Sequence, residues 1–408
     1  MNAPCPFDTA YLTNPHPVHV ALRESGAVHR IALPDGAEVW LLTRETDIRQ
    51  ALTDPRLSVD RQHSRGGYTG FNLPPALDAN LLNRDGSTHR RLRRHAARAF
   101  TPRRVEGLRA SIQAETDRLL SLIADQDEVD LIETFAVPLP LTVIGDLLGI
   151  PEDFRERFRA GTNALVMPDP TRPQRIVDAI TQIEEFLQEL VIDKRSNPTD
   201  DFLSDLVAQA HTDDSIDDVQ LVSLAFLIFW AGYENPVNLI GKAVLALLEH
   251  PHQLTLVRRG PALSDAAIEE LLRFAHGSQY AIRRFATEAL TIGGVEIPAG
   301  DTVMLGLASA NRDPRFTAAP DDLDLTRRNG DTHLAFGHGP HYCLGAPLAR
   351  LEIRVAIESL LTRFPHIQLT VPVRDLRWRP SFREHGLISL PVSTTGSGPA
   401  PARKGAKR

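Results

Sequence analysis

The segment at residues 336–345 constrains this chain more than any other part of its sequence. It reads Phe-Gly-His-Gly-Pro-His-Tyr-Cys-Leu-Gly, and three glycines in ten residues predict a backbone path that side chains would obstruct. Cys343 lies just before a segment with helical patterning, at 344–364. There, the positive end of the helix dipole and free N–H groups favour a thiolate over a thiol. The segment is therefore a candidate metal-binding loop.

Two other interpretations of Cys343 start from the same residues. A lone cysteine is most often a buried structural residue. Alternatively, the spacing of His338, His341 and Cys343 could bind zinc, although a fourth protein ligand or a general base is not obvious nearby. The residue pattern alone leaves these alternatives open.

Composition limits the class of protein. With 408 residues, 42% hydrophobic and 24% charged, the chain resembles a soluble globular protein large enough to enclose a cofactor. A formal net charge of -7 argues against nucleic acid as the main partner. There is no run of about 18 apolar residues to indicate a membrane span, and no signal-peptide pattern. Cys5 and Cys343 are the only cysteines, so we expect no disulfide framework and a reducing, cytoplasmic location.

Hydrophobic periodicity predicts a mainly α fold with a small β part. We expect one domain over residues 1–392 and a disordered tail at 393–408, which is rich in Gly, Pro and Lys. The longest expected helix is 215–248. Other helices are expected at 43–54, 89–100, 102–124, 135–148, 266–274 and 344–364, strands at 38–43 and within 283–306, and loops at 60–82 and 164–175.

Residues 336–345 resemble the haem-binding loop of the cytochrome P450 family (F-G-x-G-x-H-x-C-x-G) at every fixed position. The resemblance extends over nearly the whole chain, in the style of soluble bacterial members, many of which tailor natural products. It implies the single-domain cytochrome P450 fold, with haem b between the helix at about 215–248 and the cysteine loop and helix at 336–364. Cys343 would be the axial ligand of the haem iron.

Other motifs extend the resemblance. Glu270 and Arg273 match the family's E-x-x-R pair, about 70 residues before Cys343. The resemblance implies that this pair locks the core behind the haem, and Asn-Arg-Asp-Pro at 311–314 matches another family turn.

The resemblance also implies which residues hold the haem. Its two buried carboxylates need charged or hydrogen-bonding partners. Four residues match the family's positions for this role: His89, Arg93, Arg284 and His341. Further haem contacts are implied for Ala231, Phe336 and Gly345.

The long helix contains a segment like the family's oxygen-activation motif, A-G-x-[DE]-T, with one departure. Glu234 stands at the acid position, but Asn235 replaces the threonine and Pro236 follows. Asparagine cannot readily relay a proton as a hydroxyl does, so we expect a different route of proton delivery. Asn235 could position a water, Glu234 could act through water, or the substrate could donate; alternatively Asn235 only caps a broken helix. Because Pro236 has no N–H, we expect the helix to kink or open at this turn.

By the same resemblance, several side chains would line the substrate pocket. They are Tyr68, Phe71, Leu227, Tyr280, Ile282 and Phe382. Taken singly, each aromatic among them would also fit plain packing.

The implied activity is hydroxylation or epoxidation of a small organic substrate, of secondary-metabolite type, with O2 as co-substrate. Two electrons would come from a ferredoxin, and NAD(P)H would act only through a ferredoxin reductase. Neither nucleic acid nor a membrane is an expected partner. A basic face could dock an acidic ferredoxin, and its candidate residues are Arg90, Arg91, Arg94, Arg98, Arg350 and Arg354.

The atypical Asn235–Pro236 pair supports an alternative outcome. This is radical oxidative coupling or cyclisation of an aromatic substrate, tryptophan-derived or similar to a cyclic dipeptide, without oxygen insertion. Two rivals come from other classes: a zinc hydrolase built on His338, His341 and Cys343, and a haem-binding sensor without catalysis.

Overall fold

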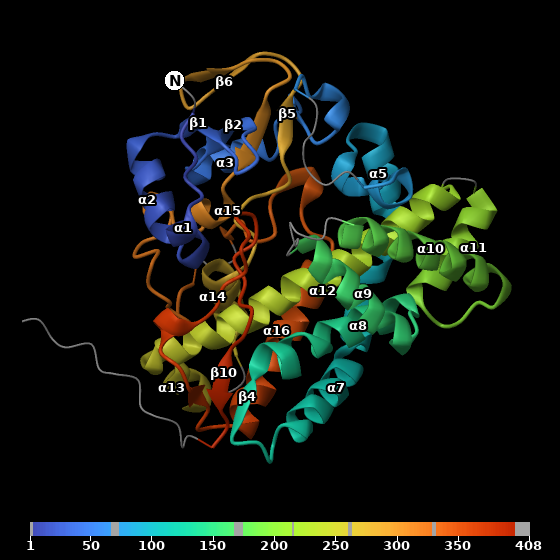
Figure 1. Cartoon of the computed structure of the whole chain (residues 1–408), viewed down its shortest axis with the longest axis vertical. Coiled ribbons are helices and arrows are strands. Elements are labelled where there is room, and N and C mark those ends of the chain that lie inside the picture. Colours follow the sequence, from blue (N-terminus) through green and yellow to red (C-terminus); the bar gives the residue numbers. More distant parts are fainter. Residues whose placement is uncertain are drawn as a thin grey trace, which may run out of the picture.

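The computed structural model describes residues 3–66, 73–166, 174–213, 216–259, 263–328 and 332–395. Helices dominate these residues and the strands are short (Figure 1), which confirms the predicted fold class. The helices are α1 (Thr9–Thr13), α2 (His16–Ser25), α3 (Glu45–Ala51), α4 (Pro75–Asp78), α5 (Gly86–Ala96), α6 (Pro102–Gly107), α7 (Arg109–Leu122), α8 (Pro138–Leu148), α9 (Glu152–Val166), α10 (Gln174–Ser196), α11 (Phe202–Asp213), α12 (Asp218–Glu249), α13 (Pro251–Arg259), α14 (Asp265–Ala275), α15 (Leu307–Ala310) and α16 (Ala346–Arg363).

The strands of the described residues form small sheets. The largest has the order β1-β2-β8-β5-β3, in which β2 and β8 pair in parallel and the other neighbours are antiparallel. A second has the order β4-β10-β9, and β6 pairs with β7. Their bounds are β1 (Val28–Ala32), β2 (Glu38–Leu42), β3 (Leu57–Ser58), β4 (Glu128–Asp130), β5 (Arg284–Ala286), β6 (Leu290–Ile292), β7 (Val295–Ile297), β8 (Thr302–Leu305), β9 (Gln368–Leu369) and β10 (Pro391–Ser393).

The long helix α12 organises the helix-rich part of the molecule. Its N-terminus is capped by Asp217, whose side chain accepts a hydrogen bond from the Gln220 N–H. The helix has 32 residues and is therefore about 48 Å long. Most of its residues are buried, and it packs on α4, α8, α10, α14 and α16. A helix that is apolar on all sides is stable only when it is surrounded in this way.

The hydrophobic core is divided between the two parts of the molecule. One large cluster joins α7, α8, α12, α14 and α16, and two smaller clusters lie under the strand-rich part, where the N-terminal helices cover the largest sheet (Figure 1). None of the described helices is both long and apolar enough to cross a membrane.

Some boundaries differ from those expected. Residues 60–82 are not a single loop, since they include α4, which begins at Pro75, and proline is tolerated in the first turn of a helix. At the C-terminus, Ser393 pairs with Glu128 and Gln368, and the Thr394 N–H donates to the Asp127 carbonyl. The fold therefore continues beyond the boundary expected at 392, while residues 396–408 lie outside the described part.

Candidate active site

The loop before α16 has the tight path that its glycines predict. The Cys343 N–H donates to the Phe336 carbonyl at 3.0 Å. Gly337 and Gly339 have φ angles of 71° and 74°, a region that strongly favours glycine. A Cβ atom on Gly339 would also lie 2.6 Å from Thr53 Cγ2. Two of the loop's glycines are thus required by the backbone itself.

Cys343 lies where α16 presents its first N–H groups. Burial raises the pKa of the Cys343 thiol, while the N–H groups of Gly345 and Ala346 and the charge of Arg93 oppose that rise. The side chain still has accessible surface, so it faces a recess inside the fold. The N–H donors expected from the sequence are present, but burial outweighs them in the protein alone. A bound metal cation would deprotonate the thiol outright.

His89 of α5 and His341 of the cysteine loop lie close together beside Asp85, the residue that precedes α5. The ring centroids of His89 and His341 lie 4.1 Å apart, and His341 Nε2 lies 2.8 Å from Asp85 Oδ1. Burial alone would raise the pKa of Asp85, but hydrogen bonds, chiefly from His341, hold it well below its usual range. Burial lowers the pKa of His89 to about 4. His89 Nε2 and His341 Nδ1 are buried without a hydrogen-bond partner in the described part of the chain, so they fit an incoming polar group.

Two arginines complete this donor set. Arg93 Nη2 donates to the Tyr342 carbonyl at 2.6 Å, which ties α5 to the cysteine loop. Arg284 is 2% exposed and donates from Nη1 to the Ile282 carbonyl at 2.6 Å. Burial lowers the pKa of Arg284 to about 10, so it remains charged at neutral pH. One buried and one partly exposed cation, both with donor capacity left over, fit the two carboxylates of a haem beside Cys343.

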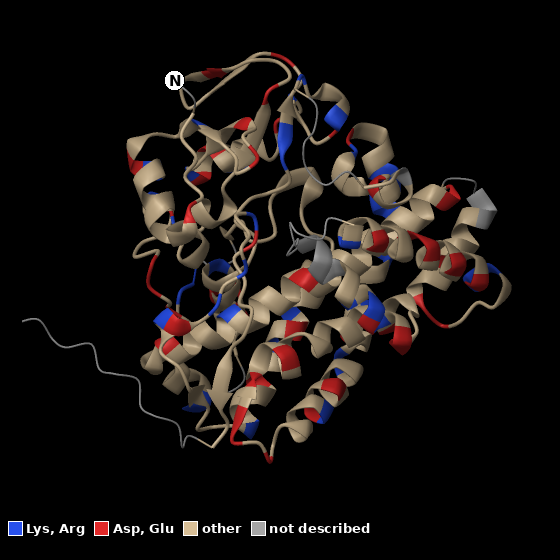
Figure 2. Ribbon diagram, viewed as in Figure 1, with Lys and Arg blue, Asp and Glu red and all other residues tan. Residues whose placement is uncertain are grey.

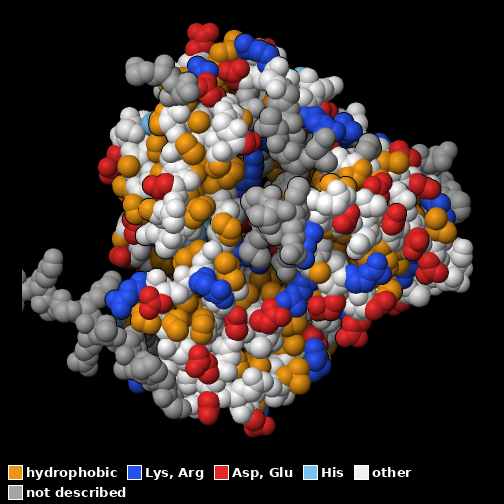
Figure 3. Space-filling model, in the orientation of Figure 1, with side chains coloured by type: hydrophobic (Ala, Val, Ile, Leu, Met, Phe, Trp, Pro, Cys, Tyr) orange, Lys and Arg blue, Asp and Glu red, His pale blue; other side chains and the backbone are white. Residues whose placement is uncertain are grey.

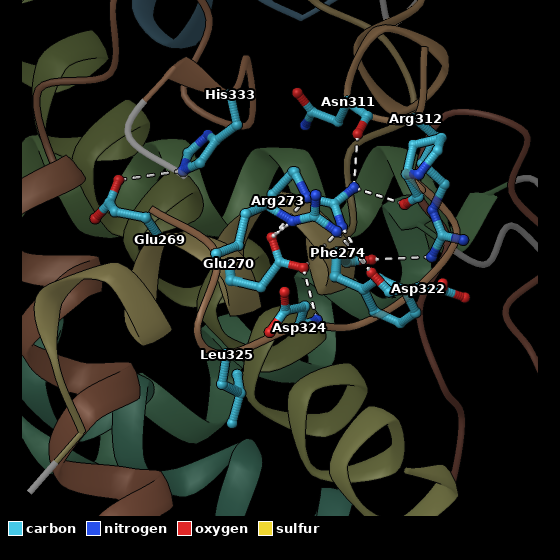
Figure 4. Close-up of polar contacts among 12 residues, drawn as sticks. Glu269, Glu270, Arg273, Phe274, Asn311, Arg312, Asp322, Asp324, Leu325 and His333 are labelled. Atoms are coloured by element: carbon cyan, nitrogen blue, oxygen red, sulfur yellow. Dashed lines mark hydrogen bonds and ion pairs between the residues drawn. The ribbon is translucent and has the colours of Figure 1, made fainter. Parts of the chain in front are cut away.

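Glu270 and Arg273 form a buried ion pair behind the loop (Figure 4). Arg273 Nε lies 2.7 Å from Glu270 Oε2, and Arg273 Nη1 donates to the Asn311 carbonyl at 2.8 Å. Asn311 Oδ1 in turn accepts the Leu334 N–H at 2.6 Å. The pair therefore connects α14 to the segment that enters the cysteine loop.

The neighbouring Glu269 connects α14 to α16. Its carboxylate lies 2.6 Å from Arg350 Nε and 3.2 Å from His333 Nε2 (Figure 4 shows the contact with His333). Burial would raise the pKa of Glu269, but Arg350 and His333 lower it to about 2. Arg350 pairs with Glu269, and Arg354 pairs with Asp265. These two of the six arginines expected to dock a ferredoxin are therefore already engaged within the chain.

The turn of α12 at Glu234 combines a buried acid with an exposed amide. Glu234 is buried and ion-paired with Arg379. Burial raises the pKa of Glu234 although Arg379 opposes the rise. Asn235 is exposed in the middle of this otherwise buried helix, and its Nδ2 donates to the Ala231 carbonyl at 3.3 Å. Asn235 therefore also faces a recess.

The helix does not open at Pro236, while the kink expected there stays a prediction. α12 remains helical from Asp218 to Glu249. Packing on all sides of the helix outweighs the local preference of proline, as tertiary contacts commonly do.

Sequence reasoning missed two residues beside Asn235, namely Ser278 and Glu384. Ser278 Oγ lies 3.1 Å from Asn235 Oδ1 and 3.0 Å from Glu384 Oε1. Burial raises the pKa of Glu384 to about 7, and Ser278 opposes the rise. Ser278 and Glu384 are 106 positions apart, so no local motif could have joined them.

The predicted pocket residues are only partly gathered at this site. Tyr68 and Phe71 lie outside the described residues. Tyr280 and Phe382 make ring contacts with Phe7 in the core of the strand-rich part, and the Tyr280 hydroxyl lies 2.9 Å from that of Tyr11. Leu227 is buried on α12 and Ile282 is half-buried.

The zinc interpretation is wrong. No three metal-ligating side chains of the described residues come together in a way that could hold a metal ion, and His338, His341 and Cys343 are all among those residues. His341 instead turns toward Asp85 and His89.

Comparisons with known proteins identify the family to which the chain belongs. The Cytochrome P450 family model matches residues 262–381. Cytochrome P450 107B1 of Saccharopolyspora erythraea is 42% identical over 95% of this chain and 96% of its own length.

Solved structures are similar over the same extent. The tirandamycin C-bound P450 monooxygenase TamI is 42% identical, with a TM-score of 0.88 over 95% of this chain and 99% of that one. CxnD, a cytochrome P450 enzyme for C–S bond formation in chuangxinmycin biosynthesis, is 35% identical, with a TM-score of 0.84 over 93% of this chain and 94% of that one. The chain is therefore an oxidoreductase of the monooxygenase type and belongs to the cytochrome P450 family.

Proposed function

We propose that this protein binds haem b through Cys343 and oxidises a small secondary-metabolite substrate with O2 and two electrons delivered by a ferredoxin. The observation that carries the proposal is the donor set around the cysteine loop. His89 and His341 each have a buried ring nitrogen without a partner in the described part of the chain, and Arg93 and Arg284 add two cations. When bound, haem supplies the chemistry of dioxygen activation.

The chain's own residues would hold and orient the reactants. The N–H groups of Gly345 and Ala346 stabilise a thiolate on Cys343. The buried Glu270–Arg273 pair fixes the segment that leads into the loop. On the opposite helix, Glu234 is fixed by Arg379, and Asn235 is exposed to the recess.

Electrons would enter near α5. Arg90 and Arg94 are exposed on α5, and Arg98 is exposed just after it. Arg91 is engaged by Gln220 at 2.9 Å, and Arg350 and Arg354 pair with acids. We therefore assign the docking surface for an acidic ferredoxin to Arg90, Arg94 and Arg98. NAD(P)H would contribute only through the ferredoxin reductase.

Turnover under heavy-isotope dioxygen tests the reaction class. The holoprotein, with a surrogate ferredoxin and reductase, is offered a panel of polyketide, terpenoid and tryptophan-derived compounds that perturb its Soret band. We expect a product that retains one labelled oxygen atom. Absence of both spectral response and product across the panel would contradict the proposal.

A second outcome has its own observation, the amide at position 235. Because Asn235 offers no hydroxyl, a substrate radical could couple or cyclise before oxygen is inserted. CxnD, the similar cytochrome P450 enzyme for C–S bond formation, supports an outcome in which a bond other than carbon–oxygen is made. A product that is oxidised but unlabelled in the same experiment would identify this reaction.

A further inference from the structure

Asn235, Ser278 and Glu384 form a continuous polar chain at the recess. Ser278 Oγ lies 3.1 Å from Asn235 Oδ1 and 3.0 and 3.2 Å from the two oxygens of Glu384. Ser278 and Glu384 are also held opposite each other by an isolated antiparallel bridge. Three elements remote in the sequence thus fix the position of one hydroxyl.

The Ser278 hydroxyl has one hydrogen and two acceptors within reach. When Glu384 is ionised, that hydrogen points to the carboxylate. When Glu384 is protonated, its O–H donates to Ser278 Oγ, and the serine hydrogen then points to Asn235 Oδ1. The protonation state of Glu384 therefore sets the direction in which the hydroxyl donates.

Several charged groups act on Glu384. From α12, Glu234 raises its pKa and Lys242 lowers it, and Arg379 also lowers it. Lys242 itself has a pKa lowered to about 7 by burial, and its Nζ donates to the His276 carbonyl at 2.8 Å. The adjacent His385 is neutral, because burial lowers its pKa to about 2. Burial has a larger effect on the pKa of Glu384 than these neighbouring groups and raises it to about 7. Both protonation states of Glu384 are therefore accessible near neutral pH.

Resting on the function proposed above, we infer that Glu384 and Ser278 form a proton relay that ends beside Asn235 and replaces the hydroxyl missing from position 235. One proton leaves the Glu384 carboxyl and is received by Ser278 Oγ. The Ser278 hydroxyl proton passes to an acceptor in the recess, and Asn235 Oδ1 holds the hydroxyl in that direction beforehand. Glu384 is left as a carboxylate and regains a proton from solvent. No electrons move in the relay.

We assign the relay to Glu384 rather than Glu234, because Glu384 contacts Ser278 whereas Glu234 Oε1 is paired with the buried Arg379. Asn235 serves as a positioning residue, since its amide neither gains nor loses a proton at neutral pH.

Infrared spectroscopy of the holoprotein tests the relay without any turnover. In pH-difference spectra we expect a protonated carboxyl band that titrates with a midpoint of about 7. Glu384→Gln should remove the band, and Ser278→Ala should shift it, because the hydroxyl that contacts the carboxyl is gone. Glu296→Gln, at an exposed strand position, is the matched control and should leave the band unchanged. A band that is unaffected by Ser278→Ala would overturn the relay.

Coupling of electrons to product supplies the second readout, with whichever panel substrate turns over. In Ser278→Ala we expect product per NADPH to fall by about tenfold or more, with peroxide rising, since a positioned general acid contributes about 10²–10⁴-fold. Glu384→Gln can still donate to Ser278 and so preserves the hydroxyl's direction, but it has no acidic proton. Product per NADPH should therefore fall in Glu384→Gln by as much as in Ser278→Ala. Product per NADPH equal to that of wild type in Glu384→Gln would overturn the relay.

Rescue separates the relay from a structural role. Asn235→Thr restores a hydroxyl in the recess, so the Ser278→Ala/Asn235→Thr double variant should recover most of the lost coupling. No recovery would contradict the relay. Failure of the proposed function is distinguishable, because it would show as wild-type protein without a thiolate-haem spectrum, whereas failure of the relay alone leaves that spectrum intact.

Discussion

The two sides of the recess differ in how their polar groups are satisfied. On the cysteine side, which comprises the loop at 336–345, α14 and α16, the polar contacts form one buried network, from Glu270 and Arg273 through Asn311 to Leu334. On the helix side, which comprises the Glu234 turn of α12 with Ser278 and Glu384, an exposed amide and a half-buried carboxyl share one hydroxyl.

This difference separates two tasks. The network from Glu270 and Arg273 to Leu334, in which each named group has a partner, has one arrangement and suits a segment that must hold a cofactor in place. A hydroxyl with two acceptors has two arrangements and suits a group that must pass a proton on. The cysteine side also follows the family pattern at every fixed position, whereas the helix side departs from it at Asn235 and Pro236.

Breaking the cysteine-side network should have the largest effect. Arg273→Ala leaves Glu270 buried without its main partner, and removing one member of a buried pair costs about 3–5 kcal/mol. We expect a correspondingly lower free energy of unfolding in urea and loss of haem on purification. The exposed Arg109–Glu106 pair, between α7 and α6, provides the control, since Arg109→Ala should change the urea midpoint little. Equal losses of stability in the two variants would contradict the difference between the buried and the exposed ion pair.

A buried acid on the cysteine side gives a pH-dependent prediction. Burial raises the pKa of Glu352 on α16 to about 8 from an ordinary value of 4.5. The folded protein then binds this proton more tightly than the unfolded chain, so its free energy of unfolding falls as pH rises from about 4.5 to about 8.

Glu352→Gln should remove the decrease in the free energy of unfolding that Glu352 causes between about pH 4.5 and about pH 8. Urea midpoints at about pH 6 and about pH 9 would show it, because the variant should gain stability over wild type mainly at the higher pH. Glu296→Gln, at an exposed site, should not. A variant that is equally stabilised or destabilised at both pH values would contradict the shift.

On the helix side, Asn235→Thr should change chemistry rather than stability. The added hydroxyl provides a second donor in the recess, so we expect product per NADPH to rise a few-fold, with an unchanged Soret band and urea midpoint. Reduced coupling would contradict this expectation, because it would mean that a hydroxyl at position 235 cannot replace the direction that the Asn235 amide gives to Ser278.

The smallest expected effect is on the rate of reduction by ferredoxin, and it concerns α5, which belongs to neither side of the recess. Arg94→Glu should slow reduction by ferredoxin severalfold at low salt, with the difference vanishing as salt is added, because exposed charges act mainly on association. Stopped-flow reduction would measure it, with the exposed Arg363→Glu at the far end of α16 as control. An equal slowing in both variants would argue against a docking surface at α5.

The sequence predicted those parts of the site whose residues are close together along the chain. The cysteine loop is contiguous, and Glu270 and Arg273 share one helical turn, so their patterns could be read directly. The Ser278–Glu384 and Glu234–Arg379 contacts join positions 106 and 145 apart. No periodicity encodes such contacts.

The structure differs from the sequence-based expectation at Pro236, and nothing in the sequence indicated the role of Asp85. Each difference has a physical reason. At Pro236 the sequence shows the local helix-breaking tendency of proline but not the packing that surrounds α12. Asp85 was missed because, although it stands at the N-cap of α5, its side chain makes no cap hydrogen bond and turns to His341 instead.

Thiolate ligation of a haem iron by Cys343 can be tested through the absorption spectrum of the reduced protein under carbon monoxide. We expect a strongly red-shifted Soret band in wild type and in Cys5→Ala, the matched control, and its loss in Cys343→Ala. A red-shifted band that persists in Cys343→Ala, or a wild-type protein that binds no haem, would contradict it.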